Sequence, residues 1–146
     1  MQIHQKAHDF KLLDQDGKPW RLSDFLGKYV LLYFYPKDNT PGCTKEACGI
    51  RDLYGQFQKE GIVVLGVSRD SAESHKRFAE KYSLPFLLLS DPKGEVVKAY
   101  EADRLASVKR ISYLIGPDGA IIKFYPKVDT ATHAGDVLED LRKIDL

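Results

Sequence analysis

The chain has 146 residues, with 22 Lys and Arg against 21 Asp and Glu, and a formal net charge of +1. This balance excludes the strongly basic surface of a nucleic-acid-binding protein and creates no attraction to an anionic membrane. Hydrophobic residues make up 43% and charged residues 29%, which excludes a disordered chain, and the length predicts a single domain over residues 1–146.

The first elements predicted along the chain are a hairpin and a buried strand. Residues 10–13 and 19–22 flank an Asp-Gly pair that favours a tight reversal, and a short helical turn follows Ser23. Residues 29–35 are continuously apolar, which is typical of a strand buried on both faces. This run is the longest of its kind and far shorter than the roughly 20 residues of a membrane helix, so we expect no membrane span.

Alternating helices and strands are predicted next. Apolar residues at three- and four-residue spacing predict a helix over residues 40–59, and residues 62–67 form a second buried strand. Ser71 can cap a further helix, and residues 86–89 form the strand after it.

The last part of the chain is predicted to form a hairpin and a helix. Residues 110–115 and 120–125 flank a Gly-Pro-Asp-Gly turn, and Thr132 can cap the final helix. Crossover helices favour parallel strands, whereas a tight hairpin requires antiparallel ones. We therefore predict an α/β thioredoxin-like fold: a mixed central sheet with helices on both faces and an N-terminal hairpin.

Cys43 is the strongest candidate for chemistry. It follows a buried strand at the end where open α/β sheets place their ligands. With Thr40 as the helix cap and Pro41 as the first helical residue, Cys43 takes the third helical position, where unpaired amides and the helix dipole favour a thiolate. Its neighbours are small or polar, so we expect an accessible, nucleophilic thiol.

Two other interpretations of Cys43 stay open on residue type alone. Most free cysteines in domains of this kind are inert small hydrophobes. A zinc site is disfavoured, because the chain has only two cysteines and its four histidines are scattered. We expect no metal.

Cys48 lies five residues after Cys43 on the same predicted helix. That spacing places the two Cα atoms roughly 8.7 Å apart on different sides of the helix. A disulfide needs Cα atoms within about 7 Å, so the two thiols could bond only after local unwinding. Spacing alone leaves two possibilities: a redox switch, or a Cys48 that only packs beside Ala47.

The pattern Pro36-x-x-x-Thr40-x-x-Cys43 resembles the active-site signature of the peroxiredoxins. Residues 34–44 and 47–52 are similar to the bacterioferritin-comigratory-protein, or PrxQ, subfamily, and the resemblance extends over nearly the whole chain. His8 departs from it, since many members have proline there.

This resemblance implies that Cys43 is the peroxidatic cysteine, which attacks peroxide and becomes a sulfenic acid. Thr40 would bond to the peroxide, and Arg110 would stabilise the thiolate and the departing oxygen. Pro36 would shield the thiol from water. Without the resemblance, Arg110 would be interpreted as a surface charge on a strand.

The remaining residues have supporting or resolving roles. Gly42 would contribute a backbone amide to substrate binding, Tyr35 would line the site, and Glu46 would orient the arginine. Cys48 matches the resolving cysteine of the subfamily, which forms an intramolecular disulfide. We assign no role to the two helical histidines, at positions 75 and 133.

The predicted function is a thiol peroxidase that reduces hydrogen peroxide or organic hydroperoxides, is recycled by thioredoxin or a similar dithiol, and needs no cofactor. A thiol-disulfide oxidoreductase would ordinarily need Cys-x-x-Cys, and a non-catalytic holdase would not need Thr40, Cys43 and Arg110 together. Residues 1–6 resemble neither a signal nor a transit peptide, so we expect a cytoplasmic protein. We expect a monomer or a weak dimer, with no nucleic-acid or membrane partner.

Overall fold

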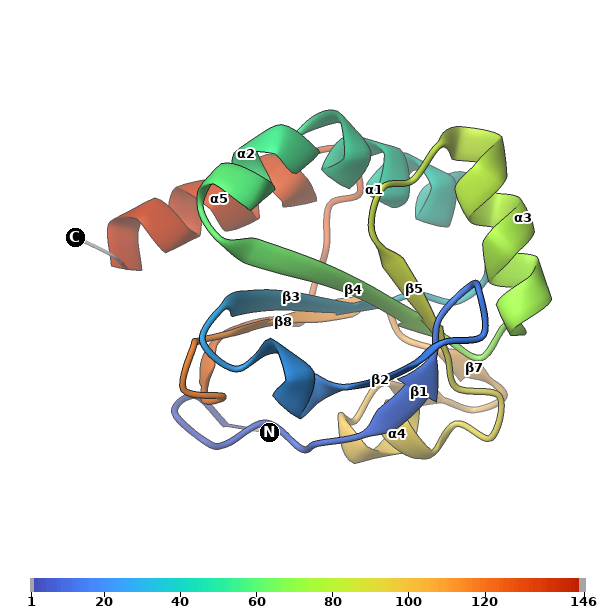
Figure 1. Ribbon diagram of the computed structural model, residues 1–146, viewed down its shortest axis with the longest axis horizontal. Helices are drawn as coiled ribbons and strands as arrows, with labels where there is room; N and C mark the ends of the chain where they lie inside the picture. The colour runs from blue at the N-terminus through green and yellow to red at the C-terminus, as the bar shows by residue number, and fades with distance from the viewer. Residues whose placement is uncertain (1, 145–146) are drawn as a thin grey trace.

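The computed structural model describes residues 2–144, which surround a seven-stranded sheet in the order β2-β1-β5-β4-β3-β8-β9 (Figure 1). The strands of this sheet are β1 (Lys11–Leu13), β2 (Pro19–Arg21), β3 (Tyr29–Phe34), β4 (Ile62–Ser68), β5 (Leu87–Ser90), β8 (Ile111–Ile115) and β9 (Ile121–Tyr125). A separate hairpin joins β6 (Asp103–Arg104) to β7 (Ser107–Val108).

The sheet is mixed, as predicted. Strands β3, β4 and β5 are parallel, whereas β8 and β9 continue the sheet antiparallel beyond β3. The N-terminal hairpin β1–β2 is antiparallel and joins the other edge through β5. The thioredoxin-like α/β prediction is therefore confirmed.

Helices cover both faces of the sheet unequally. Figure 1 shows α1 (Pro41–Asp52), α2 (Tyr54–Lys59), α3 (Ala72–Tyr82) and α5 (His133–Ile144) on one face, and α4 (Glu95–Ala99) on the other. A short 3-10 helix, η1 (Leu22–Phe25), follows β2. Each face has its own apolar core, and the two cores share β3.

Strand β3 places the start of α1 over the larger core. Because side chains alternate along a strand, Leu31 and Tyr33 point to the core beneath α1, whereas Leu32 and Phe34 point to the core beneath α4. The chain leaves the carboxyl end of β3 through residues 35–40 and enters α1. This loop therefore determines where the first turn of the helix lies.

The predicted helix over residues 40–59 is wrong in one respect, because the structure has two helices separated at Leu53. The Leu53 amide donates to the carbonyl of Ile50 at 3.1 Å, a tighter turn than the α-helix, and this turn ends α1.

The sequence also gave no indication of α4 or of hairpin β6–β7. Helix α4 contains two β-branched valines and begins after a left-handed Gly94. It is fixed by the Asp91 carboxylate, which accepts a bond from the Val97 amide at 2.8 Å.

Among residues 2–144 of the protein, no helix is both long enough and apolar enough to cross a membrane.

Candidate active site

Cys43 lies in the first turn of α1, as predicted, but it is not exposed. Thr40 adopts the extended conformation of a helix cap, Pro41 is the first helical residue, and the Thr44 amide donates to the Thr40 carbonyl at 2.8 Å. Cys43 is only 1% exposed, because this turn packs against the sheet rather than projecting beyond it. The expectation of an accessible thiol, drawn from the small and polar neighbours of Cys43 along the chain, is corrected by this tertiary contact.

Arg110 gives this buried thiol a charged neighbour. Arg110 directly precedes β8, and β8 pairs with β3 so that Ile111 lies opposite Phe34, at the end of β3 from which the chain continues to Cys43. Arg110 Nη2 donates to Cys43 Sγ at 3.4 Å. The contact places a fixed positive charge beside the thiol, which favours a reactive cysteine over an inert hydrophobic one.

Glu46 holds the other side of the guanidinium. Arg110 Nη1 donates to Glu46 Oε1 at 2.9 Å. Glu46 is 1% exposed, and its Oε2 atom has no hydrogen-bond partner among the described residues. Burial raises the pKa of Glu46 to about 7, and the Arg110 guanidinium acts in the opposite direction. The carboxyl group is therefore close to its titration point near neutral pH.

Gly42 makes room for this arrangement. A Cβ atom at Gly42 would lie 2.9 Å from Arg110 Nη2, which is closer than Cβ atoms in proteins approach other heavy atoms. A side chain at this position would therefore push the guanidinium away from its place beside the thiol.

The other residues proposed for the site lie around the same loop. The Thr40 hydroxyl donates to the Lys37 carbonyl at 2.8 Å, and the structure has no Thr40–Cys43 bond among the residues it describes. Pro36 is half-buried, two residues beyond the end of β3. Tyr35 is buried, and its hydroxyl donates to Asp38 at 2.6 Å, so its polar end serves another cluster rather than the thiol.

Cys48 faces a different environment from Cys43. It is half-buried and borders an open pocket on the surface. The other residues that line this pocket are Asn39, Pro41, Thr44, Lys45, Lys81 and Tyr82. Both thiols are free and α1 is continuous between them, so the helix must unwind before they can bond.

Both helical histidines are buried. His133 Nε2 lies 2.9 Å from Ser112 Oγ, and burial lowers the pKa of His133 to about 4, which indicates a neutral packing residue. His75 is joined to Asp38, a contact that the sequence did not predict because 37 positions separate the two residues.

Asp38, Asp70 and His75 form the one group among residues 2–144 whose ligand atoms are close enough to suggest a metal site, all within 4.8 Å. The ring of His75 already bonds within the protein through both of its nitrogens, one to Asp38 Oδ2 at 2.7 Å and the other to the Leu89 carbonyl at 3.0 Å. The cluster is therefore a hydrogen-bonded network rather than a ligand set.

Comparison with known proteins gives consistent matches. The model of the AhpC/TSA family matches residues 3–124. A putative peroxiredoxin bcp of Coxiella burnetii is 43% identical over 94% of this chain and 97% of its own length. A cysteine-to-serine mutant of Xylella fastidiosa PrxQ superposes with a TM-score of 0.94 and 33% identity, covering 100% of this chain and 98% of that one. The Xanthomonas campestris bacterioferritin comigratory protein, whose alkyl peroxide reduction was studied in trapped complexes, has a TM-score of 0.89 and 32% identity over 94% and 92% of the two chains.

Proposed function

Because the chain belongs to the AhpC/TSA family and is a thiol-dependent peroxidase of the peroxiredoxin type, we propose that Cys43 is the thiol that attacks the peroxide. The observation that carries this assignment is the 3.4 Å contact between Arg110 Nη2 and Cys43 Sγ at the start of α1. A fixed cation and the unpaired amides of a first helical turn both favour the thiolate over the thiol.

In the first step the Cys43 thiolate attacks one oxygen of the peroxide. The S–O bond forms as the O–O bond breaks, sulfur loses two electrons, and the departing oxygen takes up a proton to leave as water or an alcohol. Arg110 stabilises the negative charge on that oxygen, with the amides of Gly42 and Cys43 as further donors.

Thr40 and Pro36 complete this arrangement in the proposal. Since the Thr40 hydroxyl donates its proton to the Lys37 carbonyl, its lone pairs are free to accept the hydrogen of the bound peroxide. Pro36 lacks an amide hydrogen and keeps water from the thiol. Tyr35 supports the loop through its hydroxyl, which donates a hydrogen bond to Asp38.

In the second step the Cys48 thiol attacks the Cys43 sulfenic acid. The S–S bond forms and water leaves, so the product is an intramolecular disulfide. Because α1 separates the two sulfurs, this step requires the helix to open. An external dithiol, such as thioredoxin, then reduces the disulfide and restores both thiols.

Substrate, partner and location follow from this cycle. We assign hydrogen peroxide and organic hydroperoxides as substrates, supported by the alkyl peroxide reduction named for the Xanthomonas campestris relative. Both thiols belong to one chain, so the cycle needs only a monomer of one domain. Dithiol reductants of this type keep thiols reduced in the cytosol, which supports a cytoplasmic location.

The test is a peroxide-consumption assay with and without thioredoxin on the wild type, Cys43→Ser and Cys48→Ser. We expect Cys43→Ser to consume no peroxide, and Cys48→Ser to complete one oxidation but not to turn over with thioredoxin. Equal single-turnover rates for the wild type and Cys43→Ser would show that another group reacts.

A further inference from the structure

The loop that leads into α1 has a single buried anchor. Of residues 36–40, only Asp38 is buried, at 7% exposed, whereas the others are half-buried or exposed. A carboxylate is expensive to remove from water unless its oxygens are well bonded. The partners of Asp38 therefore determine how this loop is held.

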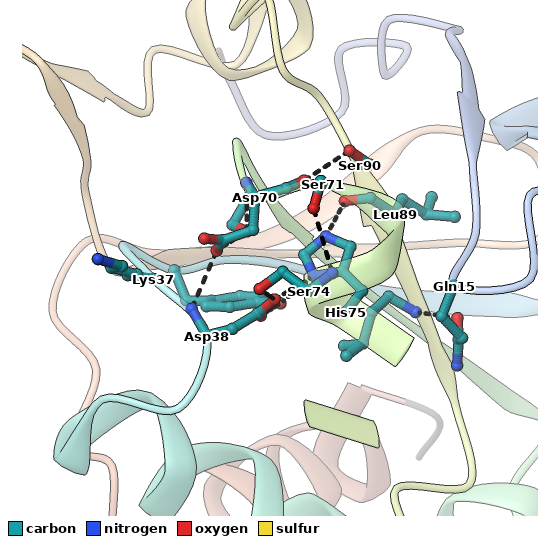
Figure 2. Close-up of polar contacts among 12 residues, drawn as sticks. Gln15, Lys37, Asp38, Asp70, Ser71, Ser74, His75, Leu89 and Ser90 are labelled. Atoms are coloured by element: carbon teal, nitrogen blue, oxygen red, sulfur yellow. Dashed lines mark hydrogen bonds and ion pairs between the residues drawn. The ribbon is translucent and has the colours of Figure 1, made fainter. Parts of the chain in front are cut away.

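Asp38 bonds to Asp70 and Ser74, which are labelled in Figure 2, and also to Tyr35. Its Oδ1 atom accepts from the Tyr35 hydroxyl at 2.6 Å, and its Oδ2 atom accepts from the Ser74 hydroxyl at 2.9 Å. Its backbone amide donates to Asp70 Oδ2 at 2.9 Å. These contacts connect the loop to the end of β3, to α3 and to the segment that follows β4.

The fourth partner is His75, a fully buried residue of α3. Its Nε2 atom lies 3.0 Å from the Leu89 carbonyl, which can only accept, so Nε2 carries a hydrogen. Its Nδ1 atom lies 2.7 Å from Asp38 Oδ2.

Other polar groups enclose the contact between Asp38 and His75. Two hydroxyl groups donate to the Asp38 side chain, and a carboxylate oxygen of Asp70 lies within 4.8 Å of the Asp38 and His75 ligand atoms. Tyr35 remains a neutral donor, since burial raises its pKa well above the ordinary value. The 2.7 Å contact between His75 Nδ1 and Asp38 Oδ2 completes the set of bonds that hold this buried side chain.

The hydrogen-bonded pair of Asp38 and His75 lies at the entrance to α1. Asp38 is two residues before the cap Thr40, and the Thr40 hydroxyl is bonded to the carbonyl of Lys37, the residue beside Asp38. Fixing Asp38 therefore fixes both the cap and the direction in which α1 begins. A shift of about 1 Å in a reacting group can slow a reaction roughly a hundredfold.

We propose that His75 and Asp38 are positioning residues for the peroxide reaction: the buried hydrogen bond between them holds the loop so that the Cys43 sulfur lies against Arg110. This inference rests on the proposed role of Cys43. It assigns a function to a histidine that does not touch the thiol.

The test compares Asp38→Asn, His75→Phe and the double variant with the wild type. We expect each single variant to form sulfenic acid roughly 10- to 100-fold more slowly, and the midpoint of the Cys43 thiol titration, followed by thiolate absorbance, to rise. The double variant should be no slower than the slower single one, because both changes remove the same pair. Rates are measured at a temperature where circular dichroism shows the variants folded.

Asp91→Asn is the matched control. Asp91 is a carboxylate 3% exposed that bonds to the Val97 amide beneath the opposite face of the sheet. We expect this variant to lose stability and keep the wild-type reaction rate and titration. Wild-type rates in folded Asp38→Asn and His75→Phe would overturn the proposal.

A measurement on the wild type keeps the proposal testable if the variants do not fold. Nitrogen-15 NMR should show both ring nitrogens of His75 in hydrogen bonds, and a ring nitrogen with the chemical shift of an unbonded imidazole would overturn the pairing. A Cys43→Ser sample in the oxidation assay separates the two claims: oxidation of that sample would contradict the role of Cys43, not the positioning by His75.

Discussion

Arg110 reaches Cys43 with a guanidinium hydrogen bond of 3.4 Å, although 67 positions separate the two residues in the chain. The same guanidinium bonds to Glu46 at 2.9 Å on its other side. The Arg110 guanidinium is thus held between the Cys43 thiol and the Glu46 carboxyl group, and this relationship yields the first prediction.

Replacing Arg110 by Ala should slow sulfenic acid formation about a hundredfold or more, because the thiolate and the leaving oxygen lose their fixed cation. The change also leaves the Glu46 carboxylate buried without a partner, which destabilises the fold. The measurement is therefore made in a Glu46→Gln background. Relative to Glu46→Gln alone, we expect the rate to fall without a large change in melting temperature. An unchanged rate would show that Arg110 takes no part in the reaction.

A change at Gly42 tests the same contact from the other side. Gly42→Ala should slow the reaction, because the new Cβ displaces Arg110 Nη2, which lies 2.9 Å from that position. Stability should be unchanged or slightly higher, since the displaced atom ends a flexible side chain and Ala favours helix by up to about 1 kcal/mol.

Gly55→Ala is the control for this prediction, because a Cβ at Gly55 in α2 meets nothing within 4 Å. It gains the same helix propensity and should react at the wild-type rate. If both variants react equally fast, the position of the guanidinium does not limit the reaction.

The local part of the site was predictable from the sequence. The apolar run of β3 and the cap formed by Thr40 and Pro41 are contiguous signals, so they placed Cys43 correctly in the first turn of a helix. Its burial was not predictable, because helix periodicity describes only the helix itself and not the sheet on which that turn packs.

The contacts between residues far apart in the chain could not be predicted from the residue pattern. Arg110 was indicated only by the family resemblance, since its contact depends on the pairing of β8 with β3. The bond between Asp38 and His75 depends on how α3 packs beside the loop, and no local spacing encodes that.

The pKa of Glu46 predicts a specific pH dependence of stability. The carboxyl ionises at its ordinary value of 4.5 in the unfolded chain and at about 7 in the fold. Between these values the folded state holds a proton that the unfolded chain has released, so the free energy of unfolding falls as pH rises. The stabilisation is complete below about pH 4.5 and is lost as pH rises through 7, by a few kcal/mol at most.

Denaturant unfolding of the wild type and Glu46→Gln across this pH range measures the effect. Their difference isolates Glu46, because the opposite contribution of His133, whose pKa is lowered to about 4, is present in both proteins. Parallel curves would show that the pKa of Glu46 is the same in the fold as in the unfolded chain, which would contradict the prediction.

Oxidation should open the helix between the two thiols. We expect amide hydrogen exchange to increase over residues 40–49 and the melting temperature to fall. The disulfide closes a loop too short to constrain the unfolded chain much, whereas the lost turns give up hydrogen bonds and packing. Helix α5 should keep its protection.

Peroxide-treated Cys48→Ser is the control for this effect, since it carries the oxidised Cys43 without a disulfide. It should keep the exchange pattern of the reduced protein. Undiminished protection of residues 40–49 in the oxidised wild type would mean that Cys48 does not resolve the sulfenic acid within the chain.

The most direct test of the two-thiol cycle is the intact mass of the protein after one equivalent of peroxide, combined with peptide mapping. We expect a monomer that has lost two hydrogens, with the loss mapped to a bond between Cys43 and Cys48. An oxygen adduct that persists on Cys43 beside a free Cys48, or a disulfide-linked dimer, would contradict it.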